Sequence, residues 1–322
     1  MHCLWCLITS ALTFATRKCN ELNDAERIQT EATPPSFIKD VSALFKLRLT
    51  LLVIISAILG YYMGHQPTDI STLLALCLGG LLLTGGSNGL NQVWEREWDK
   101  LMHRTRQRPI PTGRMSHTTA MWISVISGVI GVFILWYFIN TASGILGLSA
   151  ILMYVFLYTP LKRVSSIAVL VGAFPGAIPP MLGYVANTND FGLEAGLLFA
   201  MQFVWQFPHF WAIAWVSEED YKRAGYKLLP FDEGQTPRTA FQILLYSLFL
   251  IPVSLLPWAL PLDKPMIGNV AAVGAIVMGL VMPYYAIKLY RTCEMTYARK
   301  VMFASFFYLP IVQLLYVLDC CY

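Results

Sequence analysis

The chain has 322 residues, of which 56% are hydrophobic and 13% charged, and its formal net charge is +4. A mean hydropathy of +0.55 excludes an ordinary soluble domain, so the composition predicts an integral membrane protein. The seven cysteines are odd in number and Cys77 lies within an apolar segment, which indicates free thiols rather than a disulfide framework.

Residues 1–38 form a separate N-terminal region. Its first apolar run, HCLWCLITSALTF, lacks the basic start and the small-residue cleavage site of a signal peptide, and the acidic stretch that follows argues against a transit peptide. We interpret this region as a mobile, disordered tail or an artefact of the chosen start site, and we expect the membrane domain to occupy residues 39–322.

Nine apolar segments follow, each close to the length of a membrane-spanning helix. The sequence therefore predicts an all-α, polytopic membrane protein with nine transmembrane helices. With this count, 22 of the 23 Lys and Arg residues fall on one side of the membrane and only Lys264 on the other, which predicts a cytoplasmic N-terminus. The segments are expected at about 47–64, 72–92, 119–140, 144–160, 165–187, 193–216, 239–260, 267–287 and 301–318.

The second segment ends in three oxygen-bearing side chains, Asn91, Glu95 and Asp99, at four-residue intervals. Each such step turns a helix by about 40°, so the three side chains share one face. Carboxylate and amide oxygens suit Mg²⁺, which keeps coordination positions for substrate phosphate, so the pattern indicates a metal-diphosphate site. The alternative is a solvated helix end with ion pairs among its charges.

Basic side chains that suit phosphate binding come next in the chain. Arg104, Arg106, Arg108 and Arg114 follow the acidic face, and guanidinium groups bind phosphate oxygens through paired hydrogen bonds. Lys162, in the loop after the fourth segment, has two interpretations: it reaches a phosphate, or it only anchors a helix end at the membrane surface.

The fifth and sixth segments carry features of a cavity wall. The range 175–183 contains three prolines and two glycines, which indicates either the wall of a cavity or a simple kink. His209 lies in an apolar helix among aromatic residues that include Trp205 and Trp211. A membrane-embedded histidine is a candidate functional residue, and a histidine bonded to a neighbouring carbonyl is the other interpretation.

Three motifs resemble those of a known family. They are N-x-x-x-E-x-x-x-D-x-x-M-x-R-T-x-x-R-P from Asn91 to Pro109, Y-T-P-L-K-R at Tyr158–Arg163, and P-H-F-W-A-x-A-W with a later D-Y-x-x-A-G between Pro208 and Gly225. Together they resemble the heme O synthases, or protoheme IX farnesyltransferases, a branch of the UbiA-type intramembrane prenyltransferases. The resemblance covers residues 40–318, and it implies a UbiA-type helical bundle.

The resemblance implies transfer of the farnesyl group of farnesyl diphosphate to a vinyl group of heme B, with water completing the new substituent and diphosphate released. The implied cofactor is Mg²⁺ or Mn²⁺, and the implied metal ligands are Asn91, Glu95, Asp99 and Asp220. These four residues and Lys162 are the expected catalytic residues. Diphosphate is expected at Arg104, Arg108, Lys162, Arg163 and Arg223, and heme at His209, Trp205 and Trp211.

Several expectations concern the cellular setting. We expect a bacterial cytoplasmic membrane, with the mitochondrial inner membrane as the alternative. A heme A synthase or assembly factors of terminal oxidases are the expected protein partners, and no nucleic acid is expected to bind.

The sequence departs from the family pattern in three places, one of which is the tail before residue 38, which has no counterpart in the family. Glu95 stands where many members have aspartate, and His209 and Ser217 stand near positions where quinone-modifying members have aspartates. Two other functions remain open: prenyl transfer to an aromatic acid, a quinone precursor or a chlorophyllide, and action as a secondary transporter or channel.

Overall fold

A computed structural model describes residues 36–260 and 265–320. The chain separates into two compact units, residues 1–41 and residues 42–322. Apart from residues 36–38, the tail expected at 1–38 lies outside the described residues. Lys264, the single basic residue expected on the opposite side of the membrane, also lies outside them.

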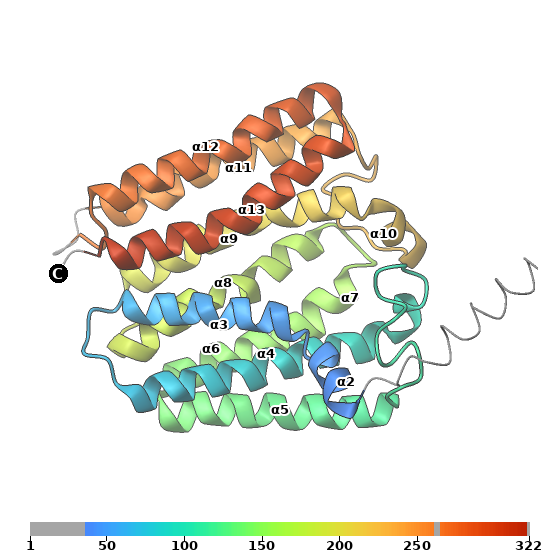
Figure 1. The fold of residues 1–322 in the computed structure, drawn as a ribbon, viewed down its shortest axis with the longest axis horizontal. Helices are drawn as coiled ribbons and strands as arrows, with labels where there is room; N and C mark the ends of the chain where they lie inside the picture. Colours follow the sequence, from blue (N-terminus) through green and yellow to red (C-terminus); the bar gives the residue numbers. More distant parts are fainter. Residues whose placement is uncertain (1–35, 261–264, 321–322) are drawn as a thin grey trace, which may run out of the picture. The chain divides into compact units, whose positions relative to one another are not determined.

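The described residues form helices and no strand, as predicted (Figure 1). Several helices in the second unit begin at side-chain caps, which satisfy backbone N–H groups that would otherwise lack partners. In chain order the helices are α2 (Phe37–Leu44), α3 (Leu47–Tyr62), α4 (Ile70–Asp99), α5 (His117–Phe138), α6 (Thr141–Leu152), the π-helix η1 (Met153–Tyr158), α7 (Thr159–Leu161), α8 (Ile167–Thr188), α9 (Leu193–Val216), α10 (Glu218–Ala224), α11 (Pro237–Ala259), α12 (Asn269–Thr292) and α13 (Met295–Leu318).

The start of α4 shows how such a cap works. The carboxylate of Asp69 accepts hydrogen bonds from the backbone N–H groups of Ser71 and Thr72. Hydrogen bonds from Thr72 and Ser71 lower the pKa of Asp69 to about 2. The cap therefore stays ionised at neutral pH, where its negative charge also suits the positive end of the helix dipole.

Every predicted span contains a helix, but the count of nine spans is not confirmed. Within the described residues, seven helices are long and apolar enough to cross a membrane, or eight if α2 and α3 form one span. The helix α9 has 24 residues and is not among them. It carries Gln202, Gln206 and His209, whose polar side chains lower its hydropathy. All three are buried, so this side of α9 faces the interior of the helical bundle.

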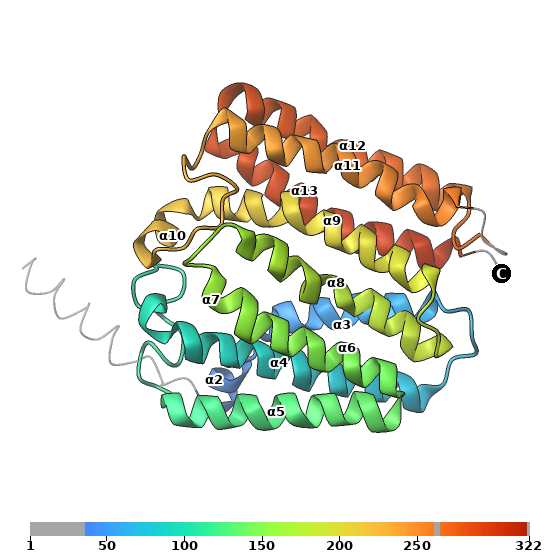
Figure 2. The same ribbon diagram turned by 180° about the vertical axis from the view of Figure 1, so that it is seen from behind.

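Within the second unit, α9 holds a central position. Figures 1 and 2 show it between α8 and α13, and it also packs against α11. The helix α4 packs along α5, and α3 packs along α8. The loops at residues 100–116, 162–166 and 217–236 meet at the end of the bundle opposite the C-terminus, and we call this the basic end (Figure 2).

Glycines allow α3 and α8 to approach closely. A Cβ atom on Gly183 would collide with the backbone oxygen of Ala57, and one on Gly60 would collide with the backbone of Pro180. Small residues at such positions allow membrane helices to pack backbone to backbone. The wall that α3 and α8 build together therefore depends on both glycines.

We predict that Gly183→Ala destabilises the protein by about 1–3 kcal/mol, because the new methyl group must push α3 and α8 apart. Gly196→Ala is the matched control, since nothing lies within 4 Å of the added carbon. It should leave stability unchanged or raise it by up to ~1 kcal/mol through helix propensity. Thermal unfolding of both variants in detergent, followed by circular dichroism, checks this; equal melting temperatures would contradict it.

Candidate active site

The end of α4 carries three buried polar side chains on one face. Asn91, Glu95 and Asp99 are 1%, 4% and 0% exposed. The helix runs unbroken to Asp99, so the four-residue spacing places all three on the same side, as predicted. The alternative of a solvated helix end applies instead to Glu97 and Lys100, an ion pair of 2.7 Å whose side chains are both exposed.

Each of these three side chains contacts a different cation. The Nζ atom of Lys162 lies 2.8 Å from Oε1 of Glu95, and Nη1 of Arg108 lies 2.7 Å from Oδ2 of Asp99. Lys46 donates from Nζ to Oδ1 of Asn91 at 3.1 Å. Charges this deeply buried are stable only when paired, so the three contacts hold the site together.

One acceptor in this group lacks a partner. Oδ1 of Asp99 is buried and, within the described part of the chain, receives no hydrogen bond. A buried carboxylate oxygen without a donor is costly unless a cation or a water molecule satisfies it. Together with the oxygens of Asn91 and Glu95, it provides the hard oxygen donors that Mg²⁺ prefers, so these residues fit the predicted metal.

A π-helix positions Lys162. The wide turn of η1 lets the Thr159 hydroxyl donate to the carbonyl of Tyr154, and Thr159 in turn accepts a hydrogen bond of 3.1 Å from Asn91. The ammonium of Lys162 lies 4.5 Å from the centre of the Tyr158 ring. Burial acts against its charge, but the charge and hydrogen bond of Glu95, together with the neighbouring Tyr154 and Tyr221, outweigh burial and raise the pKa of Lys162. Lys162 therefore stays charged at neutral pH.

The predicted residue Asp220, on α10, holds the loop that follows α4. Its carboxylate accepts the backbone N–H groups of His103 and Arg104 at 3.1 and 3.3 Å, and Arg223 contacts it at 3.2 Å. Burial acts against its charge, but the hydrogen bonds from His103 and Arg104 lower the pKa of Asp220. Arg104 also donates to the Tyr221 hydroxyl at 3.1 Å. This network fixes the loop 100–116 over the site.

Not all the predicted ligands come together. Among residues 36–260 and 265–320, no group of three or more His, Cys, Asp or Glu side chains lies close enough to hold a metal ion. The metal role of Asp220 therefore stays a prediction. Arg163 stacks on Trp98, with 4.6 Å between its guanidinium and the ring centre, and Arg223 pairs with Asp220 and Glu219 on α10.

An apolar cavity of about 530 Å³ begins beside these residues. Arg104, Tyr154, Tyr158 and Tyr221 line it near the basic end. Pro175, Gly176 and Pro179 also line it, which confirms that this part of α8 is a cavity wall. Its remaining walls are mostly aliphatic and aromatic side chains from α3, α4, α9 and α13.

Two of the three residues predicted to contact heme line this cavity. Trp205 stacks on His209 with 4.3 Å between ring centres, whereas Trp211 packs against Tyr246 and is not part of the lining. Nδ1 of His209 lies 2.9 Å from the Ser305 hydroxyl, which itself donates to the carbonyl of Met302. His209 therefore donates from Nδ1, and its Nε2 retains a free lone pair.

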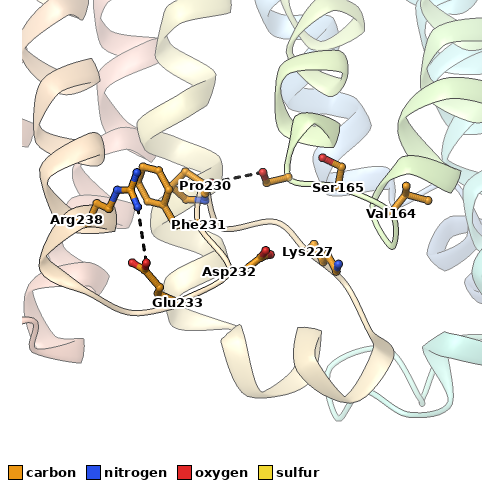
Figure 3. Close-up of a pocket in the computed structure, with 9 residues that line it drawn as sticks. Val164, Ser165, Lys227, Pro230, Phe231, Asp232, Glu233 and Arg238 are labelled. Carbon is orange, nitrogen blue, oxygen red and sulfur yellow. Dashed lines mark hydrogen bonds and ion pairs between the residues drawn. The ribbon is translucent and has the colours of Figure 1, made fainter.

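A second pocket, of about 350 Å³, lies at the basic end between the loops 164–166 and 227–238 (Figure 3). Arg238 stacks on Phe231 at 4.0 Å and pairs with Glu233 at 3.7 Å. The backbone N–H of Lys227 donates to the carbonyl of Lys162 at 2.7 Å. The segment that begins at Lys227 therefore contacts the backbone of Lys162 directly.

Comparisons with known proteins identify the family of the chain. The model of the UbiA prenyltransferase family matches residues 53–309, which is more than half of the chain. The chain belongs to the UbiA prenyltransferase family.

Relatives in this family are similar over nearly their whole length. A protoheme IX farnesyltransferase of Flavobacterium psychrophilum is 45% identical, with 89% of this chain and 96% of the relative covered. One of Christiangramia forsetii is 44% identical, with 88% and 94% covered.

Solved structures share the fold. A digeranylgeranylglyceryl phosphate synthase has a TM-score of 0.71 at 18% identity, with 88% of this chain and 98% of that chain covered. A UbiA homologue from Archaeoglobus fulgidus bound to GPP and Mg²⁺ has a TM-score of 0.64 at 14% identity, with 86% and 99% covered.

Sequence reasoning missed one member of this UbiA site. Lys46 is one of the 22 basic residues that the sequence places on one side of the membrane, and no site role was predicted for it, yet it contacts Asn91. It adopts a left-handed backbone conformation (φ 47°, ψ 53°) between α2 and α3, which is rare for a residue with a side chain. Such strain is often found at functional positions. No local sequence pattern marks it, because its partner lies 45 residues away.

We predict that Lys162→Met destabilises this UbiA protein by about 3–5 kcal/mol, because Glu95 is left buried without a counter-charge. Adding Glu95→Gln should restore much of the loss, since the remaining pair carries no charge. Melting temperatures of the two single variants and the double variant in detergent test the coupling. A double variant that melts no higher than Lys162→Met would contradict the buried pair.

Proposed function

We propose that the chain transfers the farnesyl group of farnesyl diphosphate to a vinyl group of heme B, adds water to the product and releases diphosphate, which yields heme O. The names of the relatives support the substrate pair, since they are protoheme IX farnesyltransferases. The observation that carries the proposal is the set of three basic side chains that contact buried oxygens of α4 next to an apolar cavity.

The three basic side chains stabilise the diphosphate leaving group. Breaking the allylic carbon–oxygen bond moves negative charge onto diphosphate, and preorganised positive charge in a buried site stabilises that change. Lys46, Lys162 and Arg108 bind diphosphate oxygens in this proposal. Arg104 adds a further positive charge at the entrance of the cavity. Arg163 and Arg223, predicted at the same site, now stack or pair elsewhere, so their contact with diphosphate stays a prediction.

The side-chain oxygens that these basic groups contact are also suitable ligands for a metal cofactor. Asn91, Glu95 and Asp99 would hold Mg²⁺, and the buried Oδ1 of Asp99 is the donor most in need of it. Bound there, Mg²⁺ supplies Lewis-acid stabilisation of the diphosphate charge. Mn²⁺ remains a prediction from the resemblance.

The cavity accounts for the other half of the reaction. An allyl cation is quenched by stray water, so transfer requires a chamber that excludes solvent. The aliphatic and aromatic lining excludes water, and the aromatic faces of Tyr154 and Tyr158 stabilise positive charge. Heme is assigned to the part lined by Trp205 and His209, where the lone pair of Nε2 suits iron.

The chain is a multi-pass membrane protein, and the relatives compared above are bacterial. Location in a bacterial cytoplasmic membrane with the N-terminus inside, and association with a heme A synthase or oxidase assembly factors, are further parts of the proposal. The charge distribution of the loops supports the orientation.

We predict that cells producing this chain accumulate a farnesylated heme, because the site holds both substrates. Mass spectrometry of hemes extracted from cells with and without the chain measures it. The Asp99→Asn variant should form no farnesylated heme although it still inserts into the membrane, because the substitution removes the negative charge of a proposed metal ligand. Transfer to 4-hydroxybenzoate together with no farnesylated heme would favour the other acceptor class and contradict the proposal.

We predict that Arg108→Ala raises the KM for farnesyl diphosphate at least about tenfold, equivalent to about 1.4 kcal/mol of lost binding. Arg106→Ala is the matched control, because Arg106 lies in the same loop with its side chain exposed. Initial rates at varied farnesyl diphosphate concentrations separate the two variants. An unchanged KM in Arg108→Ala would remove Arg108 from the diphosphate site.

A further inference from the structure

Four buried polar side chains line the apolar cavity, and we call them the amide cluster: Ser56, Gln202, Gln206 and Gln313. They come from α3, α9 and α13, and each is 3–5% exposed. Ser56 donates to Oε1 of Gln202 at 3.0 Å, and Gln313 donates to Ser56 and to Gln202 at 3.0 and 2.8 Å. Buried polar side chains are expensive at membrane depth, so such a group requires a role.

Within the described residues the cluster keeps two side-chain oxygens that receive no hydrogen bond, and Gln202 and Gln206 each also keep one N–H group that donates none. Gln202 uses its amide nitrogen to donate to the carbonyl of Gly176, and Gln206 donates to that of Ala173. Both N–H groups of Gln313 are used within the cluster. Within the described residues, no hydrogen bond reaches the side-chain oxygens of Gln206 and Gln313, although both residues line the cavity.

The cluster begins close to the place where the carbon–oxygen bond breaks. A Cβ on Gly172 would touch the Tyr158 ring, and one on Gly176 would touch the Gln206 amide. Because Gly172 and Gly176 are one turn apart on α8, the Gln206 amide lies about 6 Å further along this helix than the Tyr158 ring. That ring in turn lies 4.5 Å from the Lys162 ammonium.

The chemical class of the ligand follows from these groups. The cluster carries no charge, so it offers a carboxylate or a diphosphate no counter-charge, and an isoprenoid chain gains nothing from its polar groups. A water molecule can donate both its hydrogens to two amide oxygens, which leaves a lone pair on its own oxygen free. An allyl cation or a porphyrin vinyl group offers no hydrogen-bond donor.

We infer that the amide cluster holds the water molecule that is consumed in the reaction; this inference rests on the proposed function. The allylic carbon–oxygen bond breaks with its electron pair on diphosphate, and the vinyl π pair forms the new carbon–carbon bond. A cation then remains on the vinyl carbon next to the macrocycle. The held water forms a carbon–oxygen bond there, and its proton passes to the diphosphate, so no oxidant or reductant is needed.

Holding this water solves a conflict within the cavity. Free water would quench the allyl cation before transfer, whereas total dryness would leave the second cation to lose a proton and become an alkene. A single water fixed by the amide cluster is kept for the second cation. Gln202, which bonds to both Ser56 and Gln313, is a positioning residue for the other acceptors.

The test is the product ratio of the purified full chain given farnesyl diphosphate, heme B and Mg²⁺. Gln206→Met, Gln313→Met and Ser56→Ala should each raise the ratio of alkene to alcohol product about tenfold, the change expected when one hydrogen bond of roughly 1.4 kcal/mol is lost. The alkene is lighter than the alcohol by one water, so mass spectrometry separates them. In the parent protein, reaction in H₂¹⁸O should place the label in the alcohol.

Ser254→Ala is the matched control. Ser254 is a buried serine in α11 that contacts the Tyr308 hydroxyl at 2.7 Å and does not line the cavity, so its loss should leave the ratio unchanged. Because a ratio is measured, a loss of folded protein in a variant does not alter it, and Ser56→Ala removes the least volume. A ratio that stays constant in all three cluster variants would overturn the inference. No prenylated heme of either form from the parent protein would instead overturn the proposed function.

Discussion

The structure depends on one constraint, which is that three charged or amide groups at the end of α4 lie where water cannot reach them. Asp99 is fully buried and Glu95 nearly so. A lone carboxylate cannot stay ionised there, so each needs a cation delivered from another part of the chain. Arg108 comes from the loop after α4, Lys162 from the end of a π-helix, and Lys46 from the start of α3. The site therefore fixes how these elements meet.

Several local features make sense as consequences of that constraint. The π-helix η1 and the left-handed backbone of Lys46 are both costly, and each brings an ammonium group to an α4 oxygen. The carboxylate of Asp220, by contrast, accepts hydrogen bonds from the backbone of the loop 100–116. A carboxylate at this position thus orders the loop that carries Arg104 and Arg108.

The spacing of residues in the sequence was enough to predict the helices and the shared face of Asn91, Glu95 and Asp99, because helical periodicity is a local property. Contacts between distant segments were not accessible in this way. Two residues show this limit: Lys46 is a site residue that was not predicted, and Trp211 was predicted to contact heme but does not line the cavity. Lys46 entered the site through a tertiary contact, and Trp211, two residues from His209, turned to the other side of α9 toward Tyr246. The count of nine spans is not confirmed because α9 is not apolar enough to be recognised as a span. Its polar side chains, which face the cavity, lower its hydropathy.

The ion pairs also explain why a metal and a diphosphate should bind together. In the structure Lys162 and Arg108 each pair with a carboxylate, and Lys46 contacts the amide of Asn91, so both buried carboxylates have a counter-charge. A dication alone would have to compete with these cations for Asn91, Glu95 and Asp99, and would leave them buried without partners. A diphosphate alone would draw the cations away and leave the carboxylates unpaired. When both arrive, every buried charge keeps a partner, so each ligand favours the binding of the other.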